Sequence, residues 1–531
     1  MTPPALEPPD PAAALAALQR RAHKLNGLLE VTHALITERA LDPLLDQIVA
    51  AATRVADAER CSLFLVSRDR RELWSKVAQG TRRVIRLPMG AGIAGQVAET
   101  GRVLNIPDAY ADARFNREVD VTTGFVTRSI LCVPMCARDR QVVGVLQALN
   151  HAGGPFDEDA EALLLALGAV AAGAIENAAL YEEREQLFEG FVTASVGAIE
   201  ARDPTTSGHS ERVATLSVLC LGALPRAHAD FAALRVGAKE MRELRYAALL
   251  HDFGKVGVRE PVLVKANKLY PEQLELVRAR FREARLVAEA EMLRARVALL
   301  EGEAPDLSGT DRRASGTDRR ARLDAIEAAW RARDAALVEM LGFVEAANRP
   351  TVLPSGGFER LAAVAAEQYH APLDPAPRAL LAPHEVENLR IPRGSLNEAE
   401  RLEIESHVTH TIRFLSQIPW TRELARVPHI AGAHHEKLDG TGYPARSPSE
   451  AIPIEARVMT VADIYDALTA SDRPYKAAVP HAKAIDILWD EAKREKIDRR
   501  VLEVFVDARI PEQAAELARD SLEAIADATR G

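Results

Sequence analysis

Residues 433–444 combine two adjacent histidines, a nearby acid and a turn rich in glycine and proline. The stretch reads Ala-His-His-Glu-Lys-Leu-Asp-Gly-Thr-Gly-Tyr-Pro. His434 and His435 could each offer an imidazole nitrogen to a divalent metal ion. Two histidines alone are a weak ligand set, so the pattern indicates a metal site only if matching ligands occur elsewhere in the chain.

Matching ligands do occur, both upstream and downstream. Asp252 follows His251, and Lys255 lies one helical turn beyond this pair. The two oxygens of one carboxylate can bridge two ions while the adjacent imidazole binds one of them. Five imidazoles and two carboxylates could hold two divalent ions about 3.5–4 Å apart. Mixed nitrogen and oxygen ligation suits iron or manganese, and also zinc or nickel. Residues of these two types form the series His209, His251, Asp252, His407, His434, His435 and Asp463, the seven candidates considered below.

The order His, His-Asp, His, His-His, Asp, with the motif His-His-Glu-x-x-Asp-Gly-x-Gly-Tyr-Pro, resembles the HD-GYP family of metal-dependent phosphodiesterases. The resemblance covers about residues 193–508 and is interrupted by one large insertion. It implies an all-α HD-type phosphohydrolase domain that hydrolyses cyclic di-GMP to linear pGpG, and onward to GMP. It also implies that the seven candidates are the metal ligands, that Asp252 bridges the metals, and that Asp252 and Lys255 are catalytic. The substrate-binding residues that it implies are Lys255, Arg473, Lys476, Gly442, Tyr443 and Pro444.

The number of metal ions and the substrate rest on this resemblance. Some family members hold a third metal through a Glu four residues before the first histidine, where this chain has Thr205. We therefore expect two divalent ions, with iron or manganese favoured. The ligand spacing itself supports only a metal-dependent phosphodiesterase. The alternatives are a hydrolase of another cyclic dinucleotide or nucleotide phosphate, and a signalling module that binds nucleotide or a partner without turnover.

The first part of the chain, residues 25–180, is predicted to be an α+β domain with an antiparallel sheet flanked by helices. The order of its elements, and the segment 116–134, resemble a GAF domain, including GAF domains that bind cyclic nucleotides. Those domains carry Asn-Lys after the last strand, whereas here His151 follows Asn150. A small regulatory ligand and a purely structural or dimerising role both remain open. The predicted helices are 41–58 and 94–99, and the predicted strands are 61–67, 73–78, 84–88, 129–137 and 141–150.

A long helix is predicted over residues 156–202, and its part 181–198 is interpreted as a connector to the catalytic domain at 199–508. An apolar stripe along this helix favours a parallel coiled coil and hence a homodimer. The alternative is a helix that packs on its own domain. The stripe comprises Leu164, Leu167, Ala171, Ala174, Ala178, Tyr181, Phe188 and Val192.

The insertion, at about residues 268–390, contains two helical patterns at 271–300 and 321–347. Between them a heptapeptide, Ser-Gly-Thr-Asp-Arg-Arg-Ala, occurs twice in tandem over 308–321 and is predicted to be either disordered or a loop tip. The pattern predicts an antiparallel helical hairpin. We interpret it as a solvated arm, with a partner-binding device as the alternative.

The composition limits which classes of partner and which cellular location we expect. A formal charge of −10 over 531 residues argues against binding of a nucleic-acid polymer. The N-terminal tail, 1–24, has no signal-peptide pattern, and no apolar run reaches the ~18 residues that span a bilayer. We therefore expect a cytoplasmic protein without a membrane segment. Residues 509–531 are predicted to form a C-terminal helix or tail.

Overall fold

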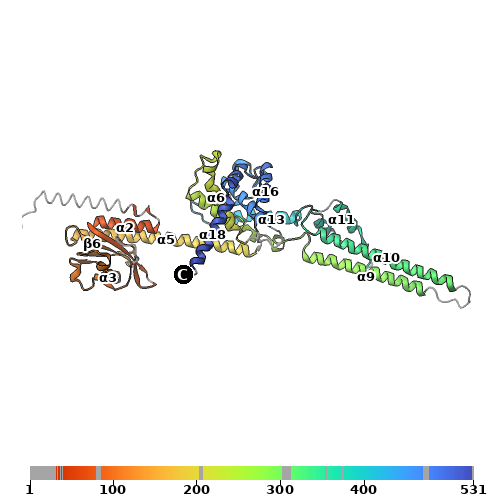
Figure 1. Ribbon diagram of the computed structural model, residues 1–531, viewed down its shortest axis with the longest axis horizontal. Helices are drawn as coiled ribbons and strands as arrows, with labels where there is room; N and C mark the ends of the chain where they lie inside the picture. The colour runs from red at the N-terminus through yellow and green to blue at the C-terminus, as the bar shows by residue number, and fades with distance from the viewer. Residues whose placement is uncertain are drawn as a thin grey trace, which may run out of the picture. The chain divides into compact units, whose positions relative to one another are not determined.

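The computed structural model describes residues 40–528 except 68, 79–84, 203–206, 302–311, 353–355, 372–375 and 471–477, together with positions 32, 34, 35, 37 and 38. The predicted N-terminal tail lies outside these residues. The chain divides into two compact units, Met1–Gly190 and Phe191–Gly531 (Figure 1).

The first unit contains a six-stranded antiparallel sheet in the order β3-β2-β1-β6-β5-β4. Each predicted strand is present, and the short β4 is an addition that the sequence pattern did not predict. The antiparallel α+β prediction is confirmed. The strands are β1 (Ala58–Ser67), β2 (Glu72–Ala78), β3 (Arg86–Pro88), β4 (Leu104–Ile106), β5 (Ile130–Cys136) and β6 (Val142–His151).

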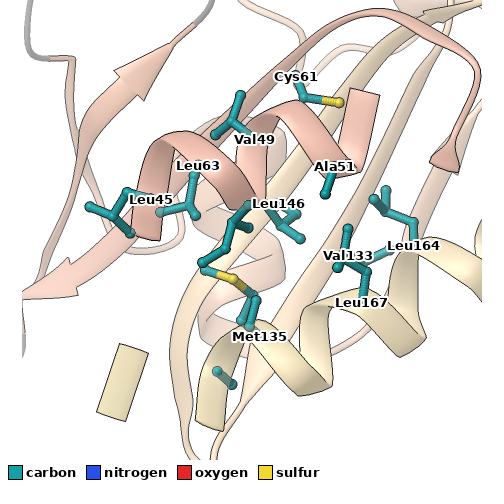
Figure 2. Close-up of a cluster of buried hydrophobic side chains, with 14 of the residues drawn as sticks. Leu45, Val49, Ala51, Cys61, Leu63, Val133, Met135, Leu146, Leu164 and Leu167 are labelled. Atoms are coloured by element: carbon teal, nitrogen blue, oxygen red, sulfur yellow. The ribbon is translucent and has the colours of Figure 1, made fainter. Parts of the chain in front are cut away.

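Side chains alternate across the sheet and fill two separate cores, because successive residues of a strand point to opposite faces. Leu63 faces the helices α2 (Leu41–Val55) and α5 (Glu158–Arg202), as Figure 2 shows together with Val133 and Leu146. Phe64 and Ile130 instead contribute to the core with α3 (Gly92–Thr100). The remaining helical segments of this unit are α4 (Arg117–Thr123) and the 3-10 turn η1 (Ala109–Ala111).

Helix α5 packs on its own domain over the first half of the predicted stripe. Leu164, Leu167, Ala171, Ala174 and Ala178 are all buried in the core of the first unit. The prediction that these five residues face a partner is therefore wrong, and the alternative interpretation holds for them. Within the described residues, α5 is the one helix long and apolar enough to cross a membrane by length and composition. Packing in this core accounts for much of its apolar character.

The second unit is largely helical, in agreement with the all-α prediction for the catalytic domain. Helix α6 packs on α7, α15, α17 and α18, while α13 packs on α14 and on the short turn η4. The helices of the bundle are α6 (His209–Ala227), α7 (Ala238–Leu250), α8 (Glu260–Leu263), α13 (Glu398–Leu415), α14 (Val427–Gly432), α15 (Ile454–Thr469), α16 (His481–Lys493), α17 (Arg499–Asp507) and α18 (Ile510–Ala528). The 3-10 turns are η3 (Ala229–Phe231), η4 (Phe253–Gly257) and η5 (Ser449–Ala451).

The insertion forms the predicted antiparallel hairpin of α9 (Pro271–Glu301) and α10 (Arg312–Ala347), which lie side by side (Figure 1). Ion pairs Arg278–Glu345 and Arg285–Asp334 connect the two helices. Three further elements share the core at the base of this hairpin. They are α11 (Gly357–Ala366), the two-stranded β7 (Gln368–Tyr369) and β8 (Arg378–Ala379), and α12 (Pro383–Leu389).

The second copy of the tandem heptapeptide departs from the prediction, whereas residues 308–311 of the first copy lie outside the described residues. The second copy, residues 315–321, is helical within α10. Extending a helix adds one hydrogen bond per residue without a new nucleation cost, so the packed part of α10 can propagate into this polar segment. Arg322 and Asp318, one turn apart, add an ion pair at 3.0 Å.

Candidate metal centre

Seven side chains of the second unit meet at one place. They come from α6, α13 and α15 and from the turns that follow α7 and α14. The structure brings all the sequence-predicted metal ligands into three overlapping groups, and within each group the nitrogen and oxygen atoms lie within 4.8 Å of one another. His251 and His434 each belong to two groups and so link them. The groups are His209/His251/Asp463, His251/Asp252/His434 and His407/His434/His435.

Three of these histidines are oriented in the same way. In His251, His407 and His434 the ring Nδ1 contacts a backbone carbonyl three residues earlier, which can only accept a hydrogen bond. Nδ1 must therefore carry the proton, and the lone pair of Nε2 is free for a metal. The acceptors are the carbonyls of Ala248, Ile404 and Ala431, at 2.7, 2.5 and 2.6 Å.

The donor atoms themselves fit a metal ion. Nε2 of His407 and Nε2 of His434 are buried and have no hydrogen-bond partner within the described part of the chain. Burying a polar atom without a partner costs free energy, and a coordinated cation would satisfy both nitrogens. Burial, followed by the neighbouring His435, holds the pKa of His434 well below its usual range. Burial likewise lowers the pKa of His435 to about 4, so both rings are in the neutral form that binds metals.

Asp252 lies between the ends of the cluster. Its Oδ1 is 3.4 Å from Nε2 of His407, and its Oδ2 is 3.4 Å from Nε2 of His251. Nζ of Lys255 lies 2.9 Å from the same Oδ2. Burial alone would raise the pKa of Asp252, but Lys255 and His251 hold it well below its usual range. The two oxygens of this carboxylate thus face different groups, as a bridging ligand would.

His209 begins α6 directly after Gly208, whose φ of 65° is readily adopted by glycine. Its Nε2 lies 3.2 Å from Asp463, and its Nδ1 lies 2.8 Å from Asp466. Burial would lower the pKa of His209, but Asp463 and Asp466 raise it to about 10. Arg212 in turn donates to Asp466 at 2.7 Å. Sequence reasoning missed Asp466, although its position three residues after Asp463 on one helix face was an available signal.

The Gly-Tyr-Pro turn is anchored to the metal-binding segment. The Tyr443 N–H donates to the carbonyl of His435 at 3.2 Å, and the two rings are 4.8 Å apart. A Cβ on Gly442 would meet backbone atoms at 2.4–2.6 Å, so only glycine fits there. Glu436 is buried, and its two oxygens each accept one backbone hydrogen bond from beyond the turn. The donors are the N–H groups of Ala445 and Ser447, at 2.7 and 2.8 Å.

Backbone contacts also join the segments that carry the ligands. Thr411 on α13 accepts the Gly254 N–H at 2.8 Å and donates to the carbonyl of His251 at 2.9 Å. Thr460 on α15 donates to the carbonyl of His434 at 2.8 Å. These threonines hold the ligand-bearing backbones in register, and no short motif in the sequence marks them.

Three residues used in the sequence predictions lie outside the described residues. They are Arg473 and Lys476, the predicted phosphate contacts, and Thr205, on which the expectation of two rather than three metals rested.

Comparison with known proteins identifies both domains. A GAF domain model matches residues 40–175, and an HD domain model matches residues 379–501. The second match includes His407, His434, His435 and Asp463. The chain therefore combines a GAF domain with an HD domain.

Two curated relatives are phosphodiesterases. The dual 3′,5′-cyclic-AMP and -GMP phosphodiesterase 11A of Takifugu rubripes is 38% identical over 29% of this chain and 18% of that protein. The cGMP-specific 3′,5′-cyclic phosphodiesterase of Drosophila sechellia is 35% identical over 29% of this chain and 14% of that protein. The chain thus spans less than a fifth of the length of either relative.

Two solved structures were also matched. The GAF domain of a phosphoenolpyruvate-protein phosphotransferase from Coxiella burnetii is 21% identical, with a TM-score of 0.29, over 31% of this chain and 98% of that one. A GAF domain/HD domain protein from Geobacter sulfurreducens is 16% identical, with a TM-score of 0.23, over 28% of this chain and 98% of that one.

Proposed function

We propose that this chain is a cytoplasmic, metal-dependent phosphodiesterase that hydrolyses cyclic di-GMP to pGpG, and onward to GMP, under control of its GAF domain. The observation that carries the proposal is the set of three overlapping His/Asp groups with Asp252 between them. Two divalent ions, iron or manganese, would supply Lewis-acid activation of water and neutralisation of phosphate charge when bound. Cyclic di-GMP as the substrate is supported by the complete His-His-Glu-x-x-Asp-Gly-x-Gly-Tyr-Pro motif.

The protein side chains have separate tasks in this proposal. The seven candidate ligands would hold the cations, and Asp252 could offer one oxygen to each of two groups. Lys255 carries an ammonium group beside Asp252 and can contact a phosphate oxygen as a point charge. Arg473 and Lys476 would add further contacts to phosphate. The turn 442–444, anchored by Glu436, would shape the mouth through which the substrate enters.

Regulation by the GAF domain requires a physical route, and the last turn of α5 offers one. Arg202 donates to the carbonyls of Val256 and Val258, directly after Lys255. Glu200 accepts the N–H of Gly208 at 2.9 Å, directly before His209. One helical turn thus contacts the backbone beside two parts of the cluster. A rotation or shift of α5 would be transmitted to both.

A homodimer through the connector remains part of the proposal, but on a different face of α5 from the predicted stripe. Leu180, Leu187 and Phe191 are exposed by 62%, 76% and 45% and follow one another at helical spacing. Charged substitutions at Leu187 and Phe191 are expected to weaken dimerisation in sedimentation experiments.

A cyclic mononucleotide is the second candidate, because the curated relatives act on cyclic AMP and cyclic GMP by name. Each match covers under a third of this chain, which is the size of one domain. A cyclic mononucleotide could therefore be either the substrate of the HD domain or the ligand of the GAF domain. A thermal-shift screen with cyclic nucleotides tests whether the GAF domain binds one. If none of them changes the melting temperature, only a structural or dimerising role is left for the GAF domain.

The decisive experiment uses protein purified without oxygen and loaded with iron or manganese. Incubation with cyclic di-GMP, cyclic AMP and cyclic GMP in parallel, followed by chromatography, should yield pGpG from the first. Asp252→Ala is the control and should form no product. Turnover of a mononucleotide alone would replace the proposed substrate. No product from any of the three would favour a binding module.

A further inference from the structure

Helix α9 has two apolar faces, and its neighbour α10 covers only one of them. Val277, Phe281 and Ala284 are buried in the core that α9 shares with α10. Five other large apolar side chains of α9 are exposed by 48–65%. They are Leu276, Leu286, Leu293, Val297 and Leu300.

All five exposed side chains fall on the a and d positions of a single heptad register. Leu276 and Val297 occupy a positions, and Leu286, Leu293 and Leu300 occupy d positions at intervals of seven. At 100° per residue, Phe281 falls at position f, far around the helix from this line. We call the eight a and d positions from 276 to 300 the outer seam. Its other members are Ala279, Glu283 and Ala290.

We propose that the outer seam pairs in parallel with the outer seam of a second copy of this chain. Three of the four d positions are leucine, and the a position nearest the end of the seam, Val297, is β-branched. In parallel coiled coils, leucine at d with a β-branched residue at a favours two strands. A solvated arm would be expected to carry polar side chains along this line, and contiguous exposed apolar surface usually marks an interaction site. Glu283 is the one charged member, and within its own chain it accepts the hydroxyl of Tyr369 at 2.6 Å.

The charges beside the outer seam select a second copy as the partner. In a parallel pair each g position faces the following e position of the other chain. Glu289 then faces Arg294 of the second copy, and Arg296 faces Glu301 of the second copy. Glu289 and Arg294 are exposed and Arg296 is partly exposed, so these charges face solvent in a single chain and can meet those of a second copy. This alternation of acidic and basic side chains is complementary to itself, so an identical helix matches it.

Disulfide trapping tests the parallel arrangement in the full chain. Leu300→Cys brings two thiols together at the same level of a parallel pair, within the ~7 Å Cα separation that a disulfide requires. An antiparallel pair over the same seam places them more than ~20 Å apart. Of the native thiols, Cys61, Cys132 and Cys220 are buried and Cys136 is partly buried. The unsubstituted chain therefore measures the background cross-linking through these native cysteines.

A cross-linked dimer is expected for Leu300→Cys under mild oxidation, at least tenfold above the background. Adding Leu286→Glu and Leu293→Glu to the same chain should abolish it. Val338→Glu is the matched control, because Val338 is exposed by 49% on α10, outside the seam, and should leave the cross-link intact. A cross-link insensitive to the seam substitutions, or none above background, would overturn the proposal.

Measuring the oligomeric state of substituted chains distinguishes this interface from one on α5. In a chain carrying Leu187→Glu and Phe191→Glu, sedimentation equilibrium should still show self-association. Leu286→Glu with Leu293→Glu should weaken that association at least tenfold, and Val338→Glu should not. Both seam positions are exposed in a single chain, so circular dichroism should show unchanged helix content. Equal association with and without the seam substitutions would refute the pairing.

Discussion

Gly254 lies where two backbones that carry candidate ligands come into direct contact, two residues after Asp252. A Cβ at this position would lie 1.8 Å from the carbonyl oxygen of His407 and 2.5 Å from the amide nitrogen of Thr411. Ordinary contacts begin at 3.4 Å, so Gly254→Ala must separate the two segments by about 1.6 Å. Neither neighbouring atom belongs to a flexible side chain, so the displacement is expected to reach the ligands.

The displacement changes the distance between Asp252 and His407, which belong to different ends of the cluster. Perturbing the surroundings of metal ligands typically weakens metal binding by about 10- to 100-fold. We expect at least this loss for Gly254→Ala, together with a destabilisation of about 1–3 kcal/mol from overpacking. Calorimetric titration of metal-free protein with Mn²⁺ measures the first effect, and urea unfolding measures the second.

A matched control is Gly342→Ala in α10, where a new Cβ meets nothing within 4 Å. That substitution should stabilise the protein by roughly 0.5–1 kcal/mol and leave Mn²⁺ affinity unchanged. Wild-type affinity and stability for Gly254→Ala would refute the inferred contact between the backbones. Equal loss of affinity in both variants would show that the effect is not local.

Three further substitutions test individual contacts. Lys255→Ala should lower turnover about 10²- to 10³-fold while anaerobic metal analysis finds nearly unchanged metal content, and parallel loss of both would contradict its phosphate role. Glu436→Gln deprives one backbone N–H beyond the Gly-Tyr-Pro turn of its acceptor. The loss should destabilise the turn by about 1–3 kcal/mol. Faster hydrogen exchange of residues 439–447 should reveal it. Lys265→Met leaves the buried carboxylate of Glu400 without its cation, 2.7 Å away in the wild type, and should destabilise by about 3–5 kcal/mol at pH 7. Burial works to raise the pKa of Glu400, but Lys265, together with hydrogen bonds from Asn397 and Tyr270, lowers it from its ordinary value. In the variant, burial acts on Glu400 without that cation, so Glu400 should take up a proton at a higher pH than in the wild type. The stability gap should therefore be largest at neutral pH and narrow as the pH falls from the pKa of Glu400 in the variant to its lowered pKa in the wild type. Urea unfolding that shows a constant gap from pH 7 to about pH 3 would contradict the pairing.

Local patterns predicted much of the architecture because they report on local forces. Period-two alternation marked the strands of the first unit, and helical spacing marked α2, α5, α9 and α10. The same patterns could not say which surface covers an apolar stripe. Leu164 and Leu167 look equally suited to a partner helix or to their own sheet, and only the packed core shows that the sheet covers them.

The sequence by itself determined the chemistry available to this protein. Histidine and aspartate were recognisable as donors by type, order and motif, and the Gly-Tyr-Pro turn by its residues. Tertiary structure alone decided how those donors are held. Asp466 fixes His209 from 257 positions away, and Thr411 joins the Gly254 backbone to α13 across 157 positions. Contacts between such distant positions arise when helices pack, and they leave no periodicity in the chain from which they could be read.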